Sequence, residues 1–166
     1  MKIRPVLTGD HGAIDAIVRA AFLAQFGRAD EPDLVAALRA QGDVVLELVA
    51  VENREIVGHI VFSRAHVASD ARRYPVVQLA PVCAAPEMQK RGIGSALIRQ
   101  GLELMAALGE THVFLLGHPD YYPRFGFSAK AAETFHSPWP GPHFMVNQIA
   151  AGGPTHGKLR VSAAFG

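Results

Sequence analysis

The stretch "PEMQKRGIGSALIRQGLELM", residues 86–105, combines a basic glycine turn with the start of an amphipathic helix. Gly92 and Gly94 stand two residues apart in it, although a tight turn needs only one glycine. They follow an amide and two basic side chains, Gln89, Lys90 and Arg91. This combination predicts that a negatively charged group lies against the backbone.

A phosphate group suits such a turn. The first backbone N–H groups of a helix have no intrahelical partner and lie at the positive end of the helix dipole, so they bind anions. Gly92 and Gly94 lack a Cβ, which lets an oxygen approach those donors, and Lys90 and Arg91 add positive charge. We therefore expect a pyrophosphate site here. The alternative is an ordinary glycine turn with solvated charges.

Two other phosphate motifs do not match this turn. The P-loop requires a lysine directly after its last glycine, and none follows Gly94. The dinucleotide fingerprint requires a third glycine three residues after Gly94, where Leu97 stands.

The composition restricts the class of protein. A chain of 166 residues suits one domain, 1–166, and can bury about 70% of the surface that its unfolded form exposes. Lys plus Arg (16) nearly balances Asp plus Glu (15), so we expect no nucleic-acid partner. The single cysteine, Cys83, cannot form an internal disulfide, and no signal core or run of about 18 apolar residues occurs. We therefore expect a cytoplasmic protein with no membrane partner.

Periodicity predicts alternating strands and helices. Helices are expected to begin near Thr8 or Asp10, at Asp30 with Pro32 in the first turn, and at Ile93. The segment 111–117, "THVFLLG", is apolar throughout, as a buried parallel strand would be. All the expected strands, in chain order, are 1–6, 43–51, 56–67, 74–85, 111–117, 144–150 and 158–165. This order predicts an α/β layered domain with a mixed sheet.

The glycine turn resembles the acetyl-coenzyme A signature of the GNAT superfamily of N-acetyltransferases, Gln/Arg-x-x-Gly-x-Gly/Ala. The downstream segment "YYPRFGF" resembles a second motif of that family, with Tyr122, Gly126 and Phe127 in place. The resemblance covers about residues 3 to 165. It implies a single-domain α/β fold whose mixed central sheet of six to seven strands is flanked by about four helices, with the fourth and fifth strands splayed apart.

The resemblance also implies the residues that bind acetyl-CoA. The pyrophosphate would lie on the turn, and the pantetheine arm would pair with the end of the preceding strand. These cofactor-binding residues are Val82, Cys83, Ala84, Gln89, Lys90, Arg91, Gly92, Ile93, Gly94 and Ser95. No metal is expected.

The resemblance makes Tyr122 the expected general acid, a role that a phenol suits because it is protonated at neutral pH and can donate to the departing thiolate. Its alternative role is a packing aromatic, the role expected of Tyr121. The base stays open, because "VVQLAPVCAA" contains no carboxylate. The candidates are His59, His118 and Glu31, and the alternative is uptake of free amine from solution.

These features predict an acetyl-CoA-dependent N-acetyltransferase that acts on a primary amine of a small molecule or peptide by direct transfer in a ternary complex. A route through an acetylated Cys83 is the less favoured mechanism, because a lone strand cysteine is usually a small buried hydrophobe. The rival function is a non-catalytic coenzyme A-binding sensor or interaction domain of the same fold. A homodimer is compatible with the resemblance, and the sequence does not identify the acceptor.

Overall fold

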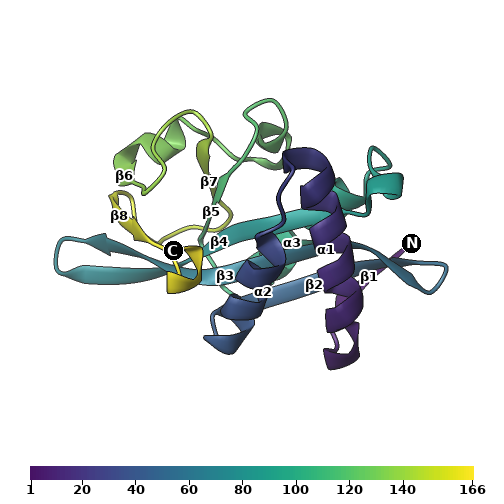
Figure 1. The fold of residues 1–166 in the computed structure, drawn as a ribbon. Helices are drawn as coiled ribbons and strands as arrows, with labels where there is room; N and C mark the ends of the chain where they lie inside the picture. Colours follow the sequence, from purple (N-terminus) through teal and green to yellow (C-terminus); the bar gives the residue numbers. More distant parts are fainter.

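A computed structural model describes residues 1–166 and shows eight strands in one mixed sheet (Figure 1). The hydrogen-bonded order is β1-β2-β3-β4-β5-β7, and β8 pairs with both β3 and β6. The β4–β5 and β6–β8 pairs are parallel and the other pairs are antiparallel. The strands are β1 Lys2–Pro5, β2 Val44–Glu52, β3 Glu55–Ser69, β4 Arg72–Ala84, β5 His112–Leu116, β6 Phe135–His136, β7 Phe144–Gln148 and β8 Gly157–Arg160. The predicted α/β fold with a mixed sheet is confirmed; the additional strand is β6, whose two residues are too few to show a period.

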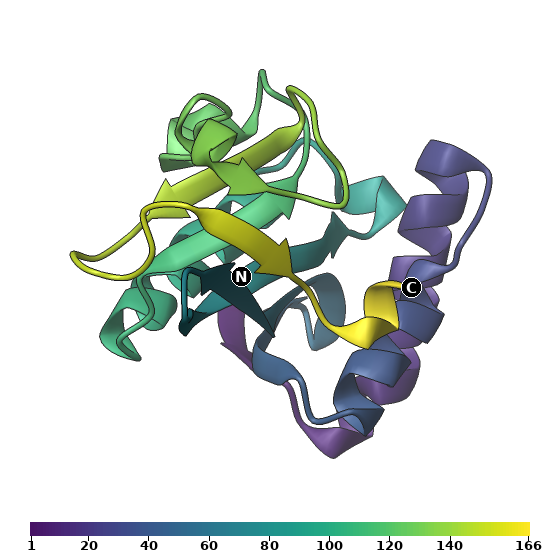
Figure 2. The ribbon, with the colours of Figure 1, turned by 90° about the vertical axis from the view of Figure 1, so that its left-hand side faces the viewer.

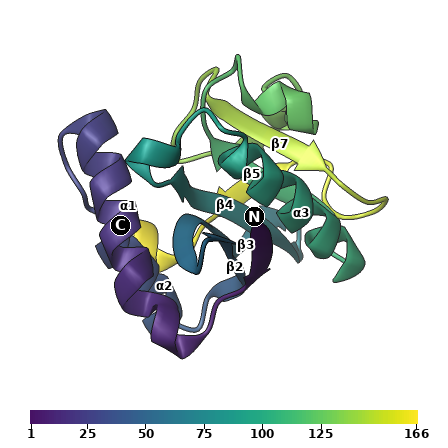
Figure 3. The ribbon, with the colours of Figure 1, turned by 90° about the vertical axis from the view of Figure 1, so that its right-hand side faces the viewer.

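Three α-helices cover the two faces of the sheet. α1 (His11–Phe26) and α2 (Glu31–Ala40) lie on one face, and α3 (Ile93–Ala107) lies on the other (Figure 3). The remaining helical segments are single 3-10 turns, η1 Thr8–Asp10, η2 Pro86–Met88, η3 Tyr122–Phe125, η4 Ala131–Thr134 and η5 Ala163–Phe165. The count is thus three α-helices where about four were expected. None of them combines the length and the apolar character that crossing a membrane requires.

The side chains of β2 point alternately to the two faces of the sheet, which explains how helices can pack on both faces. Leu48 and Ala50 point into the core beneath α3, whereas Val49 between them packs with Ile14 and Val18 of α1. Successive strand residues face opposite sides, so an unbroken apolar run can serve two helical layers. Burying each large side chain stabilises the fold by about 1.5–3 kcal/mol.

β4 and β5 separate along their length, and this separation creates the site. The two strands pair only at Val77–Val113 and Gln78–Phe114, although β4 continues to Ala84. One extra residue of β4 lies between Leu79 and Val82, where the β3–β4 register shifts. A bulge of this kind bends its strand, and Pro81 within it has no N–H to donate to a neighbour. The predicted splay therefore begins directly after Gln78.

The C-terminal segment returns to α2. β8, yellow in Figure 2, pairs with β3 at residues 66–68 and leads into η5. The strand expected over 158–165 ends at Arg160, because Ser162 begins a turn. Its hydroxyl accepts a hydrogen bond from the backbone N–H of Ala164 and donates one to Asp43 at 2.6 Å. Phe165 then packs against the buried cluster that includes Leu38, which fixes α2 beside the splayed strands.

Candidate active site

The glycine turn forms an unobstructed set of backbone donors. Lys90 (φ 61°) and Gly92 (φ 81°) both adopt the left-handed conformation, and nothing lies within 4 Å of the position that a Cβ on Gly92 would occupy. The first hydrogen bond of α3 runs from the Ala96 N–H to the Gly92 carbonyl at 3.0 Å. The N–H groups of Ile93 and Gly94 precede that bond, so they have no partner within the helix. A left-handed lysine costs roughly 1–3 kcal/mol, which is typical of a backbone held for binding.

A cavity of about 540 Å³, which we call the glycine-turn cavity, opens above these donors. Ten of its lining residues were expected as site residues, namely Val82, Cys83, Ala84, Gln89, Lys90, Gly92, Ile93, Gly94, Ser95 and Tyr122. The cavity is also lined by His118, a candidate for the base, and by Ala21, Phe22, Gln25, Met88, Ile98, Tyr121 and Arg124. Arg91 is the exception among the expected residues, because its exposed guanidinium Nη1 lies 2.9 Å from the Met88 sulfur and the side chain does not line the cavity.

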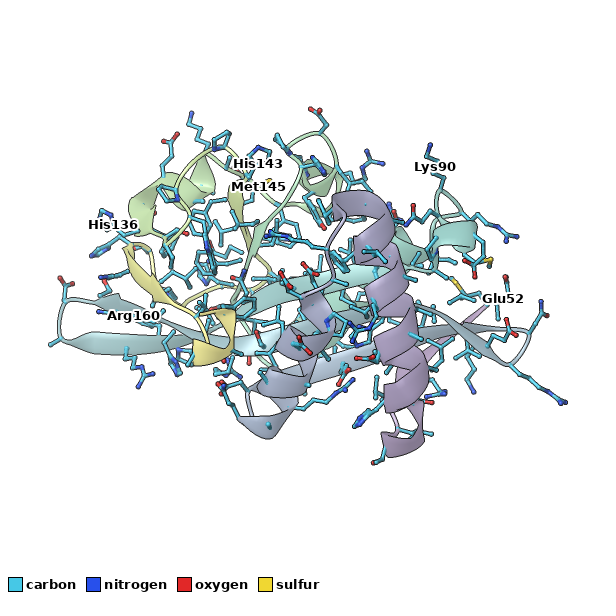
Figure 4. The ribbon with its side chains drawn as sticks, viewed as in Figure 1. Glu52, Lys90, His136, His143, Met145 and Arg160 are labelled. Atoms are coloured by element: carbon cyan, nitrogen blue, oxygen red, sulfur yellow. The ribbon has the colours of Figure 1, made fainter.

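A second cavity of about 440 Å³, the splay cavity, occupies the gap between β4 and β5. Its lining is mostly apolar and comes from α1, α2, β4, the end of β5 and the start of β7: Phe22, Gln25, Phe26, Glu31, Leu34, Leu79, Ala80, Pro81, Val82, Leu116, Gly117, His118, Tyr122 and His143. The two cavities share Phe22, Gln25, Val82, His118 and Tyr122. In the view of Figure 4, Lys90 of the glycine-turn cavity and His143 of the splay cavity appear on opposite sides of the C-terminal end of α1, whose residues Phe22 and Gln25 line both cavities.

Tyr122 stands at the junction of the two cavities. Its ring lies directly over Gly117, where a Cβ would come within 3.0 Å of two ring carbons. Burial raises the pKa of Tyr122 to about 12, and the neighbouring Tyr121 adds to the shift. The phenol therefore stays protonated across the neutral range and can donate a hydrogen bond or a proton.

Tyr121 has a more specific role than the packing expected for it. Its hydroxyl lies 2.8 Å from the Ser95 hydroxyl, which connects η3 to the first turn of α3. Its ring meets that of Tyr122 edge to face at 5.0 Å between centroids, and the Arg124 guanidinium carbon lies over the Tyr121 ring, 4.7 Å from its centroid. Tyr121 lines only the glycine-turn cavity, whereas Tyr122 lines both.

His59, one of the three candidates for the base, lies away from both cavities. Its side chain is fully buried, and its Nε2 lies 2.6 Å from a Glu47 carboxylate oxygen. Burial lowers the pKa of His59, so the imidazole is neutral and donates its Nε2–H to Glu47. Arg39 of α2 pairs with the same carboxylate. This network joins α2 to the sheet and is structural.

The other two expected candidates, His118 and Glu31, both line the splay cavity. Glu31 begins α2, and its Oε2 is buried without a hydrogen-bond partner. His143 also lines this cavity, and sequence reasoning missed it. No local pattern marks His143, because only the pairing of β7 with β5 brings it to this position.

Cys83 is half-buried and lines the glycine-turn cavity, but its thiol has the properties of a structural one. Burial raises its pKa to about 12, and its side chain packs against the α1 cluster that contains Val18 and Val49. The reactive form of cysteine is the thiolate, which is scarce at neutral pH when the pKa is this high.

A parallel strand pair that separates beside a glycine turn and a tyrosine defines an acetyltransferase of the GNAT class. The chain matches the acetyltransferase (GNAT) domain family over residues 2–129 and belongs to that family.

Two Escherichia coli K12 proteins described as uncharacterized N-acetyltransferases are similar in sequence. YjhQ is 39% identical over 120 residues, which cover 70% of this chain and 66% of YjhQ, slightly less than two thirds of its length. YhbS is 31% identical over 153 residues, which cover 90% of this chain and 88% of YhbS.

Two solved structures share the fold over almost the whole chain. One is a GNAT family acetyltransferase from Brucella melitensis in complex with acetyl-CoA, with a TM-score of 0.82, 32% identity, and coverage of 99% of this chain and 97% of that one. The other is YhbS from Escherichia coli in complex with CoA, with a TM-score of 0.85, 29% identity, and coverage of 99% and 91%.

Proposed function

We propose that this protein transfers the acetyl group of acetyl-CoA directly to a primary amine of a small molecule or peptide, within a ternary complex. The observation that carries the proposal is that two cavities, one at the glycine turn and one in the splay, meet at Tyr122. Acetyl-CoA in the glycine-turn cavity and an acceptor amine in the splay cavity would place the thioester and the amine beside the Tyr122 phenol. Holding two reactants together in this way lowers the entropic barrier to their reaction.

The glycine-turn cavity suits coenzyme A. The N–H groups of the turn and of the first turn of α3 would bind the pyrophosphate, with Lys90 as its cation. Val82, Cys83 and Ala84 pair with β3 along one edge only, because the pairing of β4 with β5 ends at Gln78. Their free edge can accept an extended amide chain as an added strand, and the pantetheine arm is such a chain. The complexes of the two similar structures with acetyl-CoA and with CoA support this assignment.

Tyr122 would act as the general acid. The amine nitrogen attacks the thioester carbon, and the C–S bond breaks as the C–N bond forms. The Tyr122 hydroxyl, which the raised pKa keeps protonated, would donate a hydrogen bond to the departing thiolate and pass a proton to it while taking one from the attacking amine, so that the phenol is restored. Direct transfer is favoured over an acetylated Cys83 because the raised pKa keeps that thiol protonated.

The lining of the splay cavity favours an acceptor whose amine is attached to a small apolar group. Phe22, Phe26 and Leu34 supply apolar surface, and Glu31 supplies one carboxylate whose buried Oε2 has no partner in the chain. A buried, unpaired carboxylate oxygen is costly, and a bound ammonium ion would compensate it. We therefore expect benzylamine, an ammonium ion at neutral pH, to be an acceptor.

The test is release of free coenzyme A from acetyl-CoA with benzylamine and with a wider panel of primary amines. We expect thiol release that depends on the amine, with stoichiometric amide in the mass spectrum. The competing function is a coenzyme A sensor, which is favoured by the lack of a carboxylate on β4 beside the cavities. An increase in melting temperature with acetyl-CoA, but no thiol release across the panel, would establish the sensor instead.

A further inference from the structure

His143 is held in one tautomer by the end of β5. It directly precedes β7, and its carbonyl accepts a hydrogen bond from the Gly117 N–H at 3.0 Å. The His143 Nδ1 in turn lies 3.0 Å from the Gly117 carbonyl oxygen. A carbonyl oxygen can only accept, so Nδ1 carries the proton. In the neutral ring the lone pair is therefore on Nε2.

The same glycine positions the two groups that acid–base chemistry needs. The Gly117 carbonyl accepts the hydrogen bond that orients the His143 imidazole. The Tyr122 ring packs against the Cα of Gly117, in the space that a Cβ would occupy. Gly117, Tyr122 and His143 all line the splay cavity. Gly117 thus connects a phenol that can donate a proton with an imidazole that can accept one.

We propose that His143 is the general base that deprotonates the acceptor amine, an inference that rests on the acetyltransferase function proposed above. Nε2 takes one proton from the ammonium ion and gives imidazolium and a neutral amine, which attacks the thioester. As the C–N bond forms and the C–S bond breaks, the amine loses its second proton to the Tyr122 oxygen while the Tyr122 hydroxyl gives its own proton to the coenzyme A thiolate. The net products are the amide, the free thiol and one proton. The His143 side chain is exposed, so it can return that proton to water.

The titratable groups that share the splay cavity with His143 are Glu31, His118 and Tyr122. His118 is the nearest rival, with its ring edge-on to that of His143 at 6.3 Å between centroids. No hydrogen bond fixes its tautomer, whereas His143 has the orienting partner that an acid–base histidine requires. Glu31 is better suited to attract the ammonium ion than to deprotonate it, because its charge offsets that of the substrate.

The test compares two acceptors of the same shape. Benzylamine is an ammonium ion at neutral pH, whereas phenylhydrazine is mainly neutral and needs no base before it attacks. His143→Asn keeps a side-chain N–H that can reach the Gly117 carbonyl but removes the proton acceptor. We expect kcat for benzylamine to fall by about 10²-fold or more, and kcat for phenylhydrazine to fall by less than about 10-fold. Added imidazole should partly restore the turnover of benzylamine by His143→Ala.

The control is His136→Asn, which alters another exposed histidine, on β6 and outside both cavities, and should leave both rates unchanged. The inference is overturned if His143→Asn slows both acceptors equally, slows neither, or if His118→Asn rather than His143→Asn shows the selective loss. A wild-type protein that acetylates neither compound would instead contradict the proposed function itself.

Discussion

The sharpest test of the proposed role of Tyr122 is the substitution Gly117→Ala. A Cβ at Gly117 would lie within 3.0 Å of two carbons of the Tyr122 ring and 3.1 Å from Cζ. Nonbonded carbon atoms need about 3.5 Å, so the ring has to move by about 1 Å. The backbone of Gly117 is not in the left-handed region, so the alanine itself introduces no backbone strain.

The expected effect is on rate rather than on cofactor affinity. A misplacement of about 1 Å of a reacting group can cost about 10²-fold in rate, which corresponds to about 2.7 kcal/mol of transition-state free energy. The glycine turn is unaltered, so the KM for acetyl-CoA should change little. The ring can move into the adjacent splay cavity, which limits the loss of folding stability to about 1–3 kcal/mol.

Steady-state release of coenzyme A with benzylamine measures the rate, and thermal unfolding shows whether the variant is folded. Gly12→Ala is the matched control, because nothing lies within 4 Å of a Cβ at that position in α1. If the alanine acts by moving the phenol, it should have little further effect in a Tyr122→Phe background. Wild-type kcat in Gly117→Ala, or a full 10²-fold loss in the Tyr122→Phe background, would refute the reasoning.

Tyr122→Phe should lower kcat by about 10²-fold or more while calorimetry shows unchanged acetyl-CoA affinity; equal losses in both would indicate a packing role. Glu31→Gln should raise the KM for benzylamine about 10-fold with little change for phenylhydrazine, because only the former is cationic. Acetyl-CoA without amine should leave Cys83 unmodified in the mass spectrum, because burial raises the pKa of its thiol to about 12; an added acetyl group there would restore the two-step route. Burial alone would raise the pKa of Glu47, but hydrogen bonds from His59 and Arg39 outweigh it and lower the pKa from 4.5 to about 2. Glu47→Gln should therefore cost about 3 kcal/mol of unfolding free energy in urea at neutral pH. The difference should shrink as the pH falls from 4.5 towards 2, because the wild-type carboxyl is then protonated as well; a difference independent of pH would assign the loss to packing.

The glycine turn could be predicted from the sequence because its chemistry is local. Gly92 and Gly94 lie at the start of α3, and the residues around them provide the donors and the charge. Side-chain direction was less predictable. Lys90, in the left-handed conformation, lines the cavity, whereas Arg91, its neighbour with the same charge, turns to Met88.

The sequence by itself determined the strand and helix order and the two motifs, since each depends on periodicity or spacing within a few residues, and the resemblance of the second motif to the family made Tyr122 the candidate acid. Only the tertiary structure decided which residues line the splay cavity and what surrounds the candidates for the base. Glu31, His118 and His143 come from three separate parts of the chain, and they meet only because β4 leaves β5 after Gln78 while β7 pairs with the other edge of β5. Such contacts depend on which strands become neighbours, and no local pattern of side chains specifies them.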